Sequence, residues 1–207
     1  MNIILADLHS NLLQAWQEIA GDKNYVTTHH GSIFEVQCDA LVSPANSFGF
    51  MDGGLDMAIS KFFGWHVQER LQQLIQVKHH GELLVGMAEI VETDHPKIPY
   101  VISAPTMRVP MILKGTVNVY LAIRAVLILI KFGKMDNGIA ISDKVKTVAL
   151  PGMGTGVGQV SSEIFARQMK RAVEEIIEGK YGFPRSWWEA AQSHQLLYSD
   201  EVRDLQY

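Results

Sequence analysis

Cysteine is almost absent from this sequence: Cys38 is the only one among 207 residues. No disulfide can form within the chain, and nothing indicates an oxidising compartment. No histidine partner for a thiol nucleophile is identifiable, so Cys38 is expected to be a small buried core residue. The eight histidines include adjacent pairs at 29–30 and 79–80, whose side chains are expected to point apart. We therefore expect no metal site and no cofactor.

Blocks of basic residues and long apolar runs are also missing. Lys and Arg number 18 against 22 Asp and Glu, which gives a formal net charge of −4. This balance argues against strong nucleic-acid binding, which needs many cationic contacts to phosphates. The longest apolar stretch, residues 117–132, contains Arg124 and Lys131 and is too short to span a bilayer, and the amino-terminal residues lack a secretion signal. The sequence predicts a soluble, cytoplasmic protein without a membrane partner.

Glycine, by contrast, is concentrated in two loops, residues 43–56 and 150–158, and each follows an apolar run typical of a strand. In the second loop glycine occupies every other position from 152 to 158. A strand of that composition would have one bare face, so a loop of exposed amides is expected. Successive N–H groups turned the same way bind anions, and a helix beginning after Val160 would add its positive end. Two such loops could hold one phosphate-bearing ligand from both sides.

Apolar periodicity predicts strands that alternate with helices along most of the chain. This alternation indicates an α/β layered sheet, in which ligands bind beyond the carboxyl ends of the strands. Both glycine-rich loops lie at such ends. The expected strands are residues 3–6, 25–28, 39–42, 83–91, 100–104 and 145–150, and the expected helices are 11–20, 56–63, 65–77, 116–132 and 161–178.

The length and composition favour one domain with a tail. A chain of 207 residues, 47% hydrophobic, can bury one sizeable core but is short for two. After Gly182 the composition changes to a mixed polar segment that contains Trp187 and Trp188. We predict a domain over residues 1–182 and a tail over 183–207 that packs on its outside.

Two motifs carry a resemblance to a known family. Residues 39–46, Asp-Ala-Leu-Val-Ser-Pro-Ala-Asn, followed by Gly-Gly-Leu-Asp at 53–56, resemble the macro domain signature, in which a D-A-(I/V)-V-N-A-A-N strand end precedes a glycine-rich loop and an aspartate. Residues 154–158 resemble that family's second loop, written S-T-G-(I/V). The order of the motifs and the ten-residue step from Asn46 to Asp56 agree with the family, and the resemblance spans residues 3–178.

The resemblance implies a three-layer α/β/α fold with a mixed six-stranded sheet and ADP-ribose in a cleft at its crest. Asn46 would contact the distal ribose, and Asp56 would activate water or orient that ribose, so these two residues are the catalytic candidates. The first loop would run beside the ribose, and the second would wrap the diphosphate. The predicted ligand-binding residues are Ser32, Ile33, Ala45, Asn46, Asp52, Gly53, Gly54, Leu55, Gly154, Thr155, Gly156, Val157 and Gly158.

The sequence departs from the family's pattern at several positions. The family's adenine-binding aspartate belongs to a G-D-(I/V) motif, and here that position is Ser32, whose hydroxyl could make a weaker contact with the base. Gly158 replaces an aromatic residue that many members have after the second loop's valine. Phe48 or Phe50 could supply the missing ring, and Asp52 is a second carboxylate near the expected ribose.

Hydrolysis at the anomeric carbon of ADP-ribose passes through a cation-like sugar, so the protein must position water and stabilise positive charge. One carboxylate and one amide can suffice, with a substrate phosphate as an additional base. Both candidates also have structural interpretations. Asp56 could cap a helix that begins at Met57, and Asn46 could satisfy the backbone of its own turn.

The sequence thus predicts a protein that binds ADP-ribose or a related NAD-derived nucleotide and hydrolyses an ADP-ribosyl linkage. Three alternatives remain open: a non-catalytic sensor of ADP-ribose, an ADP-ribose 1″-phosphate phosphatase, and an interaction protein that uses its Trp-rich tail. Turnover that disappears in Asp56→Ala while binding remains would separate the hydrolase from the sensor. The sequence does not indicate an oligomeric state.

Overall fold

A single mixed sheet forms the centre of the protein in the computed structural model, which describes residues 1–205. The strand order is β2-β1-β6-β3-β5-β4, and every neighbouring pair is parallel except β4 and β5. Short strands rich in branched side chains, separated by helices, favour this arrangement. The strands are β1 (Asn2–Asp7), β2 (Val26–His30), β3 (Ala40–Ser43), β4 (Glu89–Glu92), β5 (Tyr100–Ser103) and β6 (Thr147–Leu150).

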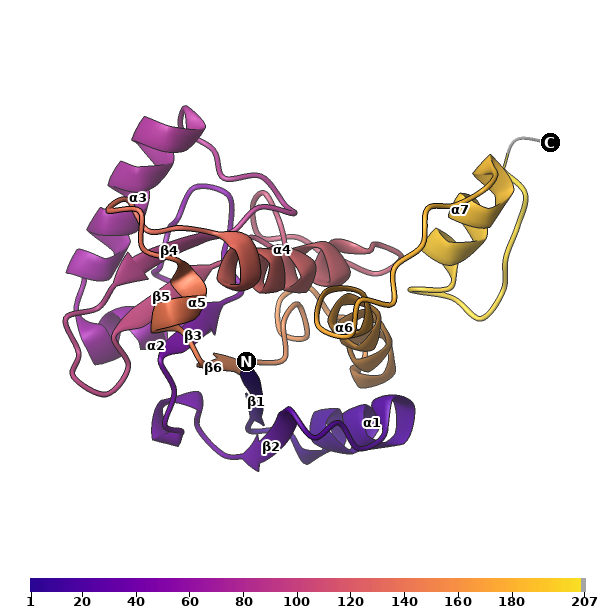
Figure 1. Cartoon of the computed structure of the whole chain (residues 1–207), viewed down its shortest axis with the longest axis horizontal. Helices are drawn as coiled ribbons and strands as arrows, with labels where there is room; N and C mark the ends of the chain where they lie inside the picture. The colour runs from indigo at the N-terminus through magenta and orange to yellow at the C-terminus, as the bar shows by residue number, and fades with distance from the viewer. Residues whose placement is uncertain (206–207) are drawn as a thin grey trace.

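Helices cover both faces of the sheet, so the protein has three layers (Figure 1). Residues alternate between the two faces along each strand: Ala40 and Val42 pack into one apolar core, and Leu41 packs into the other. The first core contains α1, α4, α5 and α6, and the second contains α2 and α3. The predicted three-layer fold is therefore confirmed. The helices are α1 (Ser10–Ala20), α2 (Gly54–Phe63), α3 (His66–His79), α4 (Asn118–Phe132), α5 (Ile141–Lys144), α6 (Ser162–Ile176) and α7 (Trp187–Gln195), with a short 3₁₀ helix η1 (Ile33–Glu35).

The strand predicted over residues 83–91 is shorter than expected. Large apolar side chains occupy every other position at Leu83, Val85 and Met87, but β4 begins only at Glu89. Gly86 has a φ of 95°, which interrupts the extended backbone, and Leu83 donates its N–H to the carbonyl of Ser47 instead. Cys38 is buried, as predicted for a core residue, but it lies just before β3 rather than within a strand.

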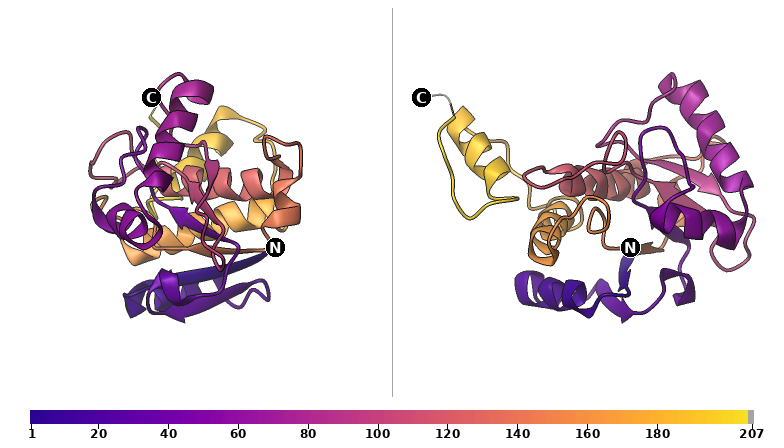
Figure 2. Two further views of the ribbon diagram at one scale, coloured as in Figure 1. Left: turned by 90° about the vertical axis from the view of Figure 1, so that its left-hand side faces the viewer. Right: turned by 180° about the vertical axis from the view of Figure 1, so that it is seen from behind.

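The tail contains a helix, α7, that the sequence did not predict. Figures 1 and 2 show α7 set out to one side of the sheet, beyond α6. The guanidinium of Arg167 on α6 connects them, because it donates to the carbonyls of Leu196 and Ser199 and to Asp200. The side chain of Trp187 remains 67% exposed. The predicted boundary at 182/183 stays a prediction, and residues 206–207 of the predicted tail lie outside the described range.

None of the helices within residues 1–205 combines the length and the apolar character that crossing a membrane would require.

Candidate functional site

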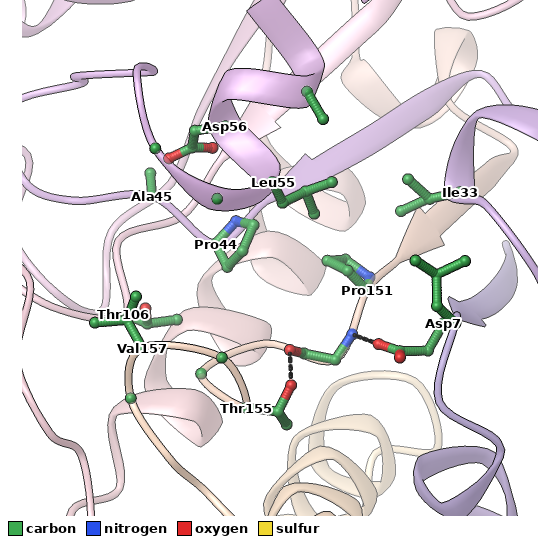
Figure 3. A pocket seen from close by; sticks show the side chains of 18 of the residues that line it. Asp7, Ile33, Pro44, Ala45, Leu55, Asp56, Thr106, Pro151, Thr155 and Val157 are labelled. Carbon is green, nitrogen blue, oxygen red and sulfur yellow. Dashed lines mark hydrogen bonds between the residues drawn. The ribbon is translucent and has the colours of Figure 1, made fainter.

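A cavity of about 560 Å³ lies where the parallel strands end at their carboxyl edge (Figure 3). The segments after β1, β2, β3, β5 and β6 and the start of α2 form its walls. Parallel strands bring their carboxyl ends together at one edge, which is why sequence-distant loops meet here. All the predicted site residues line this cavity: Ser32, Ile33, Ala45, Asn46, Asp52, Gly53, Gly54, Leu55, Asp56, Gly154, Thr155, Gly156, Val157 and Gly158. What each of them binds stays a prediction.

The second glycine-rich loop presents backbone amides to the cavity. Within residues 1–205, the amides of Gly154, Gly156, Val157 and Gly158 donate no hydrogen bond. The hydroxyl of Thr155 closes the loop by donating to the carbonyl of Gly152 at 2.7 Å (Figure 3). A concave group of unpaired N–H groups is suited to binding an anion.

Glycine is needed at two positions of this loop for steric reasons. Gly154 has a φ of 75°, and a Cβ there would lie 2.8 Å from Val119. A Cβ on Gly158 would lie 2.5 Å from the carbonyl oxygen of Gly154. Gly156 differs, because a Cβ there would meet no atom within 4 Å. The loop therefore depends on Gly154 and Gly158 for its shape, whereas Gly156 leaves open space beside the cavity.

The helix whose amino end meets the cavity is α2 rather than α6. No side chain caps α2, and the amides of Gly54 and Leu55 in its first turn donate no hydrogen bond within the described chain. The hydroxyl of Ser161 caps α6 by accepting from the amide of Ile164, but the first turn of α6 does not line the cavity. The expected contribution of the α6 dipole stays a prediction, and α2 brings a second positive helix end directly to the cavity.

Asp56 lies in the first turn of α2 and is 8% exposed. Its Oδ1 accepts a hydrogen bond from the hydroxyl of Ser43, at the end of β3. Burial raises the pKa of Asp56 to about 6; the Ser43 hydrogen bond opposes this shift, and the charge of Asp52 adds to it. The helix begins at Gly54 with Gly53 as its N-cap, so the interpretation of Asp56 as a cap was wrong. A buried carboxylate with a pKa close to neutrality is suited to accept a proton.

The raised pKa makes ionised Asp56 costly for the fold. The pKa is about 6 in the folded protein against 3.8 for an unperturbed aspartate, so stability falls as pH rises between these values. This difference corresponds to about 3 kcal/mol above pH 6. We expect Asp56→Asn to increase the free energy of unfolding by roughly 1–3 kcal/mol at pH 8 and to have little effect at pH 4, measured by urea denaturation.

Asp52→Asn is the comparison for this measurement. Asp52 is exposed, and its charge is the smallest contribution to the pKa shift of Asp56, so its removal should raise the free energy of unfolding by less than about 0.5 kcal/mol at pH 8 and leave it unchanged at pH 4. A loss of stability at pH 8 in Asp56→Asn would contradict the assignment of a destabilising buried charge.

Asn46 connects the two ends of its own loop. Its Oδ1 accepts from the amides of Phe48 and Phe50, at 3.1 and 3.3 Å, and its Nδ2 donates to the carbonyl of Phe50 at 2.7 Å. The structural interpretation of Asn46 as a turn residue is thus correct. One N–H of its amide has no partner within the described chain and is available to a ligand, because a carboxamide carries two donors.

Phe48 and Phe50, the two rings considered for stacking on a ligand, lie in different surroundings. Phe50 lines the cavity and is half exposed, whereas Phe48 does not line it and lies beneath the guanidinium of Arg108, 5.1 Å from the ring centre. Phe50 is therefore the ring that can meet a ligand.

Sequence reasoning missed the contributions of β1 and of the segment after β5. Asp7 ends β1, Leu8 and His9 follow it into the cavity wall, and Thr106 and Met107 follow β5. A polar residue directly after an apolar strand could have identified Asp7, because ligand-binding residues gather at strand ends. No motif marks the other four.

Charge in the cavity has one sign. The lining contains Asp7, Asp52 and Asp56 but no Lys or Arg, so a bound phosphate would depend on N–H and O–H donors such as the backbone amides. Within residues 1–205, no three His, Cys, Asp or Glu side chains are grouped so that they could hold a metal ion.

The sequence model of the family described as Macro domain matches residues 42–169, which is more than half of the chain. The chain belongs to the macro domain family. The match includes Asn46, Asp56 and the second glycine-rich loop, whereas Asp7 and Ser32 lie before it. The predicted family is therefore confirmed.

Curated relatives extend this result over a larger share of the chain. An uncharacterized protein of Aquifex aeolicus is 38% identical over 146 residues, which are 70% of this chain and 77% of that protein. An uncharacterized protein of Aeropyrum pernix is 32% identical over 151 residues, 73% of this chain and 71% of that protein.

Solved macrodomains share the fold. The macrodomain of Mycobacterium tuberculosis DarG superposes with a TM-score of 0.57 at 17% identity, over 70% of this chain and 87% of that one. A mutant Oceanobacillus iheyensis macrodomain with ADPR gives a TM-score of 0.58 at 17% identity, over 72% of this chain and 75% of that one. Thermosipho africanus DarTG in complex with ADP-ribose gives 0.56 at 18% identity, over 70% of this chain and 38% of that one.

Proposed function

We propose that this macro domain binds ADP-ribose and hydrolyses an ADP-ribosyl linkage. The observation that carries the proposal is the placement of a buried carboxylate, Asp56, beside one cavity that also contains the unpaired amides of the second loop. The ADP-ribose named with the Oceanobacillus and Thermosipho proteins supports this choice of ligand. The diphosphate would lie against the amides of Gly156 and Val157, and the distal ribose near Asp56.

In the proposed reaction, a water molecule attacks the anomeric carbon of the distal ribose while the bond to the leaving group breaks. The carboxylate of Asp56 accepts a proton from the water, and the leaving group takes up a proton from solvent. A cation-like sugar develops in the transition state, and the carboxylates of Asp52 and Asp56 stabilise it electrostatically. Ser43 holds the Asp56 carboxylate in place through its hydroxyl.

A non-catalytic sensor is the second candidate, and the hydrogen bonds of Asn46 favour it. The oxygen of this amide already accepts from two backbone amides, so only one of its N–H groups remains to contact a ribose. A sensor would bind ADP-ribose in the same cavity and release it unchanged.

Calorimetric titration with ADP-ribose, with AMP and NAD as comparators, tests the proposal. We expect ADP-ribose to bind at least about tenfold more tightly than AMP, because AMP lacks the second phosphate and the distal ribose that the cavity accommodates. Deletion of residues 184–207 should leave the affinity unchanged, since the tail does not line the cavity. Absence of ADP-ribose binding would refute the proposal. A function that the deletion abolishes but Asn46→Ala leaves intact would instead favour an interaction protein.

A further inference from the structure

Ser32 occupies the position at which macro domains carry a base-binding aspartate, and it has no carboxylate with which to bind a base. The hydroxyl of Ser32 accepts a hydrogen bond from the amide of Phe34 at 3.3 Å, and the amide of Ser32 donates to Glu35 at 3.3 Å. These two bonds form a capping box that begins η1. Glu35 does not line the cavity. The residues at 31–35 thus provide the cavity with a neutral hydroxyl, one of whose lone pairs is already engaged, and with no carboxylate.

A different carboxylate lies beside this segment, at the end of β1. The backbone carbonyl of Asp7 accepts from the amide of Gly31 at 3.1 Å, which fixes Asp7 next to the Gly-Ser-Ile segment. Its Oδ2 accepts from the amide of Gly152 at 3.1 Å, and its Oδ1 accepts from the amide of His9 at 2.8 Å. Asp7 is therefore held rigidly between the segment after β2 and the second glycine-rich loop.

The close fit at Gly152 keeps the carboxylate in this position. A Cβ on Gly152 would lie 2.6 Å from Oδ2 of Asp7 and 2.3 Å from Leu12. Only glycine can bring this backbone amide so near to the side chain.

Asp7 retains acceptor capacity toward the cavity. Each carboxylate oxygen has two lone pairs, and each oxygen of Asp7 receives one hydrogen bond from the described chain. No Lys or Arg lines the cavity to compensate its charge. A half-buried carboxylate with free lone pairs and no cation beside it favours a ligand that donates an N–H.

Figure 3 shows Asp7 at one end of the pocket and Asp56 at the other, with the loop that carries Thr155 along the side below them. If the distal ribose lies at Asp56 and the diphosphate at the second loop, as in the proposed function, the base lies at Asp7. We propose that Asp7 is the residue that selects the base, by accepting a hydrogen bond from the 6-amino group of adenine. It takes over the task of the carboxylate that position 32 lacks.

The test compares two ligands that differ only at that amino group: ADP-ribose and its purine analogue, in which a hydrogen replaces the amine and N1 stays an acceptor. For the wild-type protein we expect ADP-ribose to bind at least about tenfold more tightly, the effect of one charge-assisted hydrogen bond. In Asp7→Asn this ratio should fall below about threefold, because a neutral carboxamide accepts from the amine without the charge that strengthens the hydrogen bond.

The ratio separates base selection from a merely structural role. Loosening of the Gly152 loop in Asp7→Asn would weaken both ligands equally and leave the ratio unchanged, which would overturn the inference. Ser32→Ala is the matched control at the family's usual position and should keep the wild-type ratio. A wild-type ratio near one with tight ADP-ribose binding would also overturn the inference and leave the proposed function intact. Failure of both ligands to bind the wild-type protein would refute the proposed function itself.

Discussion

Gly156→Glu is expected to weaken ADP-ribose binding at least about a hundredfold, because a like charge brought against the diphosphate costs several kcal/mol. The substitution places a carboxylate beside unpaired amides that, in the proposed function, hold the diphosphate. The fold should tolerate it, since a Cβ at Gly156 meets no atom within 4 Å and its φ is not positive. Calorimetry measures the affinity, and thermal denaturation should show an unchanged Tm.

Three control variants separate charge, bulk and loop shape. Gly156→Gln has nearly the same size without the charge and should lose less affinity than Gly156→Glu. Gly182→Glu adds the same charge in open space outside the cavity and should leave the affinity unchanged. Gly158→Ala should lower both affinity and Tm, because its Cβ would lie 2.5 Å from a backbone carbonyl. Unchanged affinity in Gly156→Glu would show that the diphosphate does not lie at this loop.

The sequence predicted the sheet and most helices because their side chains follow the periodicity of the element that buries them. In α4, buried residues recur at helical spacing, and the helix ends before Gly133 as the pattern indicates. The same reasoning failed at residues 83–88, where Leu83, Val85 and Met87 keep the spacing of one strand face through a turn. A positive φ at Gly86 decides the local structure there, and periodicity does not contain that information.

The same distinction applies to the candidate site: features that local sequence determines were predictable, and contacts between distant segments were not. The glycine-rich loops were predictable because exposed amides require small residues, and both loops do line one cavity. The contact between Asp7 and Gly152 was not predictable, because it joins residues 145 positions apart through the pairing of β1 with β6. The pKa of Asp56 also depends on burial and on the hydroxyl of Ser43, which only the folded chain supplies.

Asp56→Asn is expected to lower kcat for an ADP-ribosylated substrate by about 10²–10⁴-fold, the usual contribution of a general base. The amide keeps the size of the side chain and can still accept from Ser43, so the affinity for ADP-ribose should change by no more than about threefold. Wild-type kcat/KM should fall as the pH drops through about 6, because protonated Asp56 cannot accept a proton from water. Single-turnover measurements between pH 5 and 8 would record both effects.

Asp52→Asn provides the matched control, because the charge of Asp52 raises the pKa of Asp56. Removal of that charge should shift the acidic limb of the pH profile to lower pH and reduce kcat far less than Asp56→Asn does. If Asp56→Asn retains full turnover, the water is activated by another group, such as a phosphate of the substrate. If the wild-type protein binds ADP-ribose tightly yet turns over no ADP-ribosylated substrate, the buried carboxylate serves recognition alone, and its destabilising charge is maintained for a sensor rather than for an enzyme.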